Sequence, residues 1–135
     1  MAERARRVGD HMTVTPMCIP LDADLEDAVK LMQEHGIRHL PVMDGDDLAG
    51  VVTDRDMSMI ESLLPDEWQQ ICVAEAMTPE PYTVTPDAPL WEVAKQMARE
   101  KFGCAVVTDE RGEVVGVFTT TDALRVLADL TEHEN

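Results

Sequence analysis

Two stretches of the chain carry apolar side chains with the spacing of an amphipathic helix, near i, i+3, i+4 and i+7. The apolar positions of the first stretch are Leu25, Ala28, Val29 and Met32. Those of the second stretch are Leu90, Val93, Ala94 and Met97. The pattern predicts two helices, each with one face packed against a core.

The same kinds of segment precede and follow each of these two helices. An extended piece with proline precedes it, "TVTPMCIP" (13–20) in one case and "YTVTPDAP" (82–89) in the other. Two short apolar runs joined by a polar turn follow it, which is the pattern of paired strands, at 39–53 and 104–119. A second helix then follows, at 54–64 and at 120–130. The predicted order is β-α-β-β-α, and it occurs twice.

The chain is therefore an internal repeat with an α/β fold. Leu25 aligns with Leu90 and Thr53 with Thr119, and one residue is added at a turn, where "ERGE" stands opposite "GDD". The expected boundaries are 8–64 for the first repeat, 65–73 for a connecting segment and 74–130 for the second repeat. One repeat alone is too short to bury a good core, so we expect a pseudo-two-fold pair.

The composition of the chain excludes several classes of function. The net charge of -16 argues against binding to nucleic acid, whose phosphates it would repel. No apolar run approaches the roughly 20 residues that cross a membrane. The three cysteines fit neither a disulfide framework nor a zinc site, and the four histidines lack metal-ligand spacing. We expect a reduced, cytoplasmic protein with no metal and no membrane contact.

One motif ends both strand pairs: Gly-apolar-apolar-Thr-x-x-Asp. It reads "GVVTDRD" over 50–56 and "GVFTTTD" over 116–122. Its plain interpretation is a capping box, in which the Thr hydroxyl accepts from a first-turn N–H and the Asp suits the helix dipole. This interpretation applies to Thr53 with Asp56 and to Thr119 with Asp122, and it needs no ligand.

Two β-α-β-β-α copies that both end in this motif resemble the cystathionine-β-synthase (CBS) domain pair, also called a Bateman module. The segment "HGIRHLPVMD…GVVTDRD" matches closely, and the likeness covers about residues 8 to 130. The second copy departs at "KFGCAVVTD", where the usual basic residue and proline are replaced. The resemblance implies two α/β repeats packed as a pair.

The resemblance also implies a regulatory module rather than an enzyme. Such pairs bind AMP, ADP, ATP, and in some cases S-adenosylmethionine or dinucleotides such as NAD, in clefts between the repeats. The resemblance implies that the motif Asp holds the ribose hydroxyls and the motif Thr contacts the phosphate. We expect a stand-alone pair that senses an adenine nucleotide, with no obligatory cofactor. The alternative is a ligand-free structural dimer that binds and regulates a partner protein.

The chemistry of the motif suits such a ligand as well as a cap. A helix N-terminus attracts phosphate, and a carboxylate can accept from both vicinal hydroxyls of a ribose. The motif glycine would let a planar base approach the backbone closely. From the residues alone, capping and ligand binding stand side by side.

The two candidate sites are not expected to be equal. The resemblance implies that a basic residue of one repeat meets the phosphate held by the other. Arg38, followed by His39, would serve the site of Thr119 and Asp122. The aligned positions of the second repeat are Gly103 and Cys104, so the site of Thr53 and Asp56 lacks this partner, and Arg55 would supply a local cation. The plain alternatives are a surface charge for Arg38 and a half-buried strand residue for His39.

Both second helices carry more apolar residues than one buried face needs. They are Met57, Met59, Ile60 and Leu63 in the first repeat, and Leu124, Val126, Leu127 and Leu130 in the second. We therefore expect a homodimer that buries the surplus in a closed two-fold interface.

Overall fold

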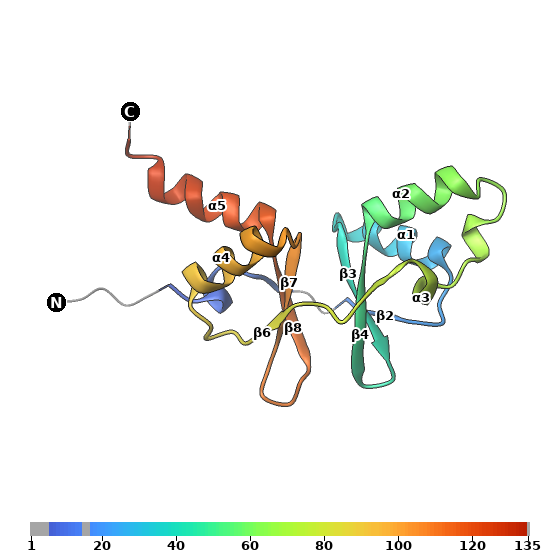
Figure 1. The fold of residues 1–135 in the computed structure, drawn as a ribbon, viewed down its shortest axis with the longest axis horizontal. Coiled ribbons are helices and arrows are strands. Elements are labelled where there is room, and N and C mark those ends of the chain that lie inside the picture. Colours follow the sequence, from blue (N-terminus) through green and yellow to red (C-terminus); the bar gives the residue numbers. More distant parts are fainter. Residues whose placement is uncertain (1–5, 15–16, 135) are drawn as a thin grey trace. The chain divides into compact units, whose positions relative to one another are not determined.

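The computed structural model describes residues 6–14 and 17–134, which form two compact units (Figure 1). The central unit comprises residues 17–81. The terminal unit joins residues 82–134 with residues 6–14 from the other end of the chain. Two residues of the expected first extended piece, Thr15 and Pro16, lie outside the described residues.

The central unit has the predicted order of helices and strands. Its elements are β2 (Ile19–Pro20), α1 (Leu25–His35), β3 (His39–Asp44), β4 (Asp47–Thr53), α2 (Asp54–Leu63), the 3-10 turn η2 (Trp68–Gln70), α3 (Val73–Ala76) and β5 (Thr78–Pro79). Trp68 and Ile71 pack the segment that follows α2 against the core of the unit.

The terminal unit repeats that order in the second half of the chain. Its elements are the 3-10 turn η1 (Val8–Asp10), β1 (Thr13–Val14), β6 (Thr83–Val84), α4 (Leu90–Glu100), β7 (Cys104–Thr108), β8 (Val114–Thr119) and α5 (Thr120–Thr131). The mixed α/β fold of two β-α-β-β-α repeats is thus confirmed.

Each four-stranded sheet takes one strand from the sequence of the other repeat. The order in the central unit is β2-β3-β4-β5, and in the terminal unit it is β1-β8-β7-β6. Strand β1 opens the first repeat but pairs with β8, where Thr13 lies opposite Val117. Strand β5 opens the second repeat but pairs with β4, where Thr78 lies opposite Val51. The spatial units therefore cut the chain differently from the repeat boundaries 8–64 and 74–130, which stay a prediction about the sequence.

A separate apolar core fills each unit, on the face of its sheet that the helices cover. In the central unit Leu25 and Met32 of α1 meet Leu40 and Val52 of the sheet, all of them buried. Figure 1 shows α1 and α2 on the same face of β3 and β4, and α4 and α5 on one face of β7 and β8. The strand pairs end at this helical layer, so the motif threonines stand where β4 passes into α2 and β8 into α5.

The ends of the two first helices offer a test of backbone strain. Both end in a left-handed residue: Gly36 after α1, with φ 62°, and Lys101 after α4, with φ 60°. A side chain disfavours this conformation, whereas glycine adopts it freely. We expect Lys101→Gly to raise the free energy of unfolding by about 0.5–1 kcal/mol in urea titrations. Gly36→Ala is the matched control and should lower it by a similar amount, and a loss of stability in Lys101→Gly would contradict the assignment.

Candidate functional site

The Thr-x-x-Asp motif of the central unit forms a complete capping box at the start of α2. The backbone N–H of Thr53 donates to Oδ2 of Asp56 over 2.9 Å. The backbone N–H of Asp56 donates back to the Thr53 hydroxyl over 3.1 Å. The capping interpretation of the sequence is therefore confirmed here. Asp56 is half-buried, and within the described part of the chain only Thr53 donates to its carboxylate.

The motif of the terminal unit has the same box, and its carboxylate accepts from three further donors. Oδ2 of Asp122 accepts from the backbone N–H and the hydroxyl of Thr119, over 2.9 and 3.1 Å. Oδ1 accepts from the hydroxyl of Thr13 over 2.9 Å and from Nη1 of Arg125 over 3.1 Å. Only 2% of the Asp122 side chain is exposed. Sequence reasoning missed Thr13 and Arg125, because nothing in the motif indicates that β1 reaches this helix.

The motif glycines have a structural cause that differs from the expected one. A Cβ at Gly116 would lie 2.6 Å from the carbonyl oxygen of Thr13 and 2.9 Å from Sδ of Met12. A Cβ at Gly50 would meet the Thr78 carbonyl oxygen at 2.5 Å. The space beside each glycine is thus filled by the strand that comes from the other repeat, β1 at Gly116 and β5 at Gly50. The crossing strand therefore requires glycine at both positions without any ligand, and the close approach of a planar base to these glycines stays a prediction.

Three basic residues named from the sequence lie at the same end of the central unit as its motif. His39 begins β3 and stands opposite Thr53 in the register of β3 with β4. Arg38 is exposed, and its Nε lies 4.0 Å from Oδ2 of Asp54, the first residue of α2. Arg55 is exposed in the first turn of α2. The structure therefore places two arginines near Thr53 and Asp56 within one unit, and one of them, Arg38, is paired with Asp54.

At the equivalent end of the terminal unit the positive charge comes from Arg125, and the position that corresponds to His39 carries none. Cys104 stands opposite Thr119 in the register of β7 with β8, at the place that His39 has in the central unit. Burial raises the pKa of the Cys104 thiol to about 11, so the thiol is neutral at pH 7. That Arg38 and His39 contact the phosphate of a ligand held by Thr119 and Asp122 stays a prediction.

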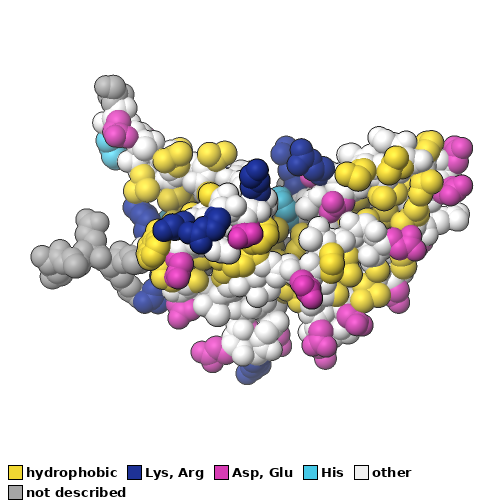
Figure 2. Space-filling view, viewed as in Figure 1, with side chains coloured by type: hydrophobic (Ala, Val, Ile, Leu, Met, Phe, Trp, Pro, Cys, Tyr) yellow, Lys and Arg dark blue, Asp and Glu magenta, His cyan; other side chains and the backbone are white. Residues whose placement is uncertain are grey.

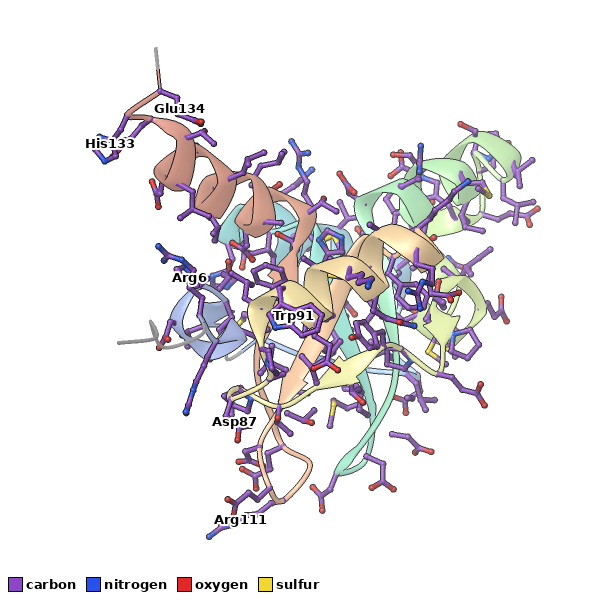
Figure 3. The ribbon with its side chains drawn as sticks, turned by 60° about the vertical axis from the view of Figure 1, so that its left-hand side comes forward. Arg6, Asp87, Trp91, Arg111, His133 and Glu134 are labelled. Atoms are coloured by element: carbon purple, nitrogen blue, oxygen red, sulfur yellow. The ribbon has the colours of Figure 1, made fainter. Side chains whose placement is uncertain are left out.

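The terminal unit also has surface hollows, and Asp122 lines none of the three described below. One of about 470 Å³ lies beside the start of α5 and is lined largely by apolar side chains, with Lys101 at its edge. Another of about 310 Å³ lies between α4 and α5 and is lined in part by Arg6 and Trp91, both labelled in Figure 3. A third, more polar hollow lies between Asp87 and the β7–β8 turn that holds Arg111 (Figure 3).

Two carboxylates at the polar hollow, those of Asp87 and Asp109, are engaged in local hydrogen bonds. The Thr85 hydroxyl donates to Asp87 over 2.6 Å and lowers the pKa of that carboxyl. Asp109 accepts from the backbone N–H groups of Arg111 and Glu113, which closes the turn. Throughout residues 6–14 and 17–134, no three His, Cys, Asp or Glu side chains gather in a way that could hold a metal. None of the helices described is both long and apolar enough to cross a bilayer.

Comparison with known proteins identifies the repeat. A family model described as the CBS domain matches residues 8–60 and 73–129. A CBS domain-containing protein of Dictyostelium discoideum is 30% identical over 131 residues, which cover 90% of each chain. Inosine-5'-monophosphate dehydrogenase of Korarchaeum cryptofilum is 37% identical over 115 residues, but these cover 85% of this chain and only 22% of the enzyme. This chain thus matches about a fifth of that enzyme's length.

Solved structures agree in fold and include complexes with adenosine compounds. CBSX2 of Arabidopsis thaliana, solved with AMP, has a TM-score of 0.73 and 27% identity, over 93% of this chain and 98% of that one. The CBS domain pair of protein MJ0100 was solved with 5'-methylthioadenosine and S-adenosyl-L-methionine. It has a TM-score of 0.81 and 25% identity, over 93% of this chain and 98% of that one.

Proposed function

This chain belongs to the CBS-domain family, and on that premise we propose that it is a regulatory module for an adenosine-containing ligand. AMP, ADP and ATP are the first candidates, and S-adenosylmethionine and NAD are the next. Binding would report the energy or metabolite state of the cytoplasm to a regulated protein. The enzyme relative shares only this segment, so we propose a sensor with no catalytic activity of its own.

The Asp56 carboxylate is the single observation that carries the proposal. It is half-buried and fixed by the capping box, yet among the described residues only the N–H of Thr53 donates to it. An ionised carboxylate has about four acceptor positions, so both hydroxyls of a ribose can bind beside the cap. Capping and ligand binding are thus compatible uses of the same side chain.

Phosphate recognition would fall to the positive groups at the same end of the central unit. The N-terminus of α2 carries the partial positive charge of the helix. Arg55 lies in its first turn, and Arg38 lies next to β3. Because the chain has a net charge of -16, such a local cluster matters for an anionic ligand. The likeness to CBSX2, solved with AMP, supports this assignment.

A ligand-free homodimer that regulates a partner protein is the second candidate, and exposed apolar side chains favour it. Leu124, Leu127 and Leu130 are exposed on α5, and Met59 and Leu63 are exposed on α2. Figure 2 shows apolar side chains along both helices on this face of the molecule. Such a surface fits a protein interface. The two candidates agree in proposing a dimer and differ in whether it needs a ligand.

Thermal unfolding with a nucleotide panel tests the proposal. A ligand at 100 times its Kd stabilises the folded state by about 2.7 kcal/mol, which raises the melting temperature of a chain of this size by about 5–10 °C. We expect this for at least one of AMP, ADP, ATP, NAD and S-adenosylmethionine, and not for GMP or GTP. No shift with any adenosine compound, together with a dimer in light scattering, would favour the ligand-free candidate.

A further inference from the structure

We propose that Arg125 decides which of the two motif carboxylates binds the ligand first. It occupies an acceptor position of Asp122, whereas Asp56 has no arginine at the matched position. This inference rests on the proposed function, and it concerns the regulation of the same sites. It reverses the ranking that the sequence suggests, in which the Thr119 and Asp122 site comes first because Arg38 and His39 are expected to serve it.

The Asp122 carboxylate has no acceptor position left. An ionised carboxylate accepts about four hydrogen bonds. The Asp122 carboxylate accepts four, two from Thr119 and one each from Thr13 and Arg125, over 2.9 to 3.1 Å. A ribose hydroxyl can bind this carboxylate only after one of these donors has left.

Within residues 6–14 and 17–134, the matching carboxylate in the central unit accepts from the N–H of Thr53 alone. Arg125 lies three residues after Asp122. The residue three positions after Asp56 is Met59, whose side chain has no hydrogen-bond donor. Thr13 pairs with β8 as Thr78 pairs with β4, but Thr78 is exposed and does not donate to Asp56. The repeat therefore places the same motif in two different hydrogen-bonding states.

Of the donors on Asp122, Arg125 is the one that can leave. The N–H of Thr119 belongs to the capping box, and its hydroxyl is held beside the carboxylate because it accepts from the N–H of Asp122 over 3.2 Å. Thr13 is held by the pairing of β1 with β8. The Arg125 side chain is 70% exposed, so its guanidinium can turn into water without leaving a buried group unsatisfied. Its release breaks a charge-assisted hydrogen bond, and the binding of a ligand at Asp122 must offset the free energy of that bond. We expect the Asp56 site to fill first.

The chain provides its own test, because Met59 and Arg125 occupy matched positions. The background is Asp56→Asn, in which AMP binding reports the Asp122 site. Adding Arg125→Met to it should tighten AMP binding by about tenfold in titration calorimetry, or ~1.4 kcal/mol. Adding Arg125→Lys, which keeps a cation, should give a smaller gain. In a separate variant, Met59→Arg should weaken the first binding event of the otherwise wild-type chain by about the same factor.

Two results would overturn the inference, and they differ from failure of the proposed function. If Arg125→Met leaves AMP affinity unchanged in the Asp56→Asn background, the ion pair does not compete with the ligand. If it weakens binding, Arg125 contacts the ligand itself. If the wild-type chain binds no adenosine compound at all, the proposed function fails and this inference fails with it. Urea titrations of each variant would verify that it is folded, since both exchanged side chains are exposed.

Discussion

Asp122→Ala is expected to lower the free energy of unfolding by about 2–4 kcal/mol, the largest effect expected of any substitution in either motif. The Thr119 hydroxyl can still accept from the backbone N–H of residue 122, but the other half of the capping box is lost. The half-buried Thr13 hydroxyl and the Thr119 N–H are left without their acceptor. Each unsatisfied buried group adds about 1–3 kcal/mol, and part of this is recovered where water enters. Urea-induced unfolding without ligand is the measurement.

Asp56→Ala is the matched control for this prediction. It removes the same half of the capping box, in which the N–H of Thr53 loses its acceptor, and within the described part of the chain no other hydrogen bond of this side chain is lost. The expected loss is about 1 kcal/mol, the lower end of the cost of one unsatisfied backbone group, because this helix start is only half-buried. Equal losses in the two variants would mean that the contacts of Thr13 and Arg125 add nothing to the stability of the terminal unit.

Gly116→Ala is expected to lower the free energy of unfolding by about 1–3 kcal/mol, because the added methyl group overpacks the contact between β8 and β1. The new Cβ would lie 2.6 Å from the Thr13 carbonyl oxygen, closer than van der Waals contact allows. The nearest obstacle is backbone, so the paired strand itself must shift. The prediction is checked by urea titration, with Gly50→Ala as its counterpart in the central unit.

The Met12 side chain provides a sharper control for the glycine prediction. Its Sδ lies 2.9 Å from the position that a Cβ at Gly116 would take, slightly farther away than the carbonyl oxygen of Thr13. If the flexible side chain were the main obstacle, Met12→Ala would rescue Gly116→Ala. We expect little rescue, because the carbonyl stays in place. A Gly116→Ala variant within about 0.5 kcal/mol of the wild type would contradict the role of the crossing strand.

Much of the fold could be predicted because the spacing of apolar residues is the same in both repeats. The spacing around Leu25 and Leu90 predicts α1 and α4, and both helices begin at those residues. The second helices were expected at 54–64 and 120–130 and are found at Asp54–Leu63 and Thr120–Thr131. The capping box could be predicted too, because it depends on contacts only three residues apart.

The strand exchange could not be predicted, and with it the environment of Asp122. Strands β1 and β5 have two residues each, too few for any alternation to reveal which sheet they join. The bond from Thr13 to Asp122 joins residues separated by 109 positions. It follows from the sheet order and not from any local pattern. The same topology explains why Gly50 and Gly116 recur, which the sequence alone led us to attribute to a ligand.

Titration of AMP into the full chain and into Asp56→Asn tests the central claim most directly, because asparagine keeps the shape of the side chain and removes its charge. The account predicts saturable binding to the wild-type chain, and a first binding event that is weakened about tenfold or more in Asp56→Asn. GMP should bind neither protein. No binding of AMP to the wild-type chain, or the same affinity in both proteins, would contradict it.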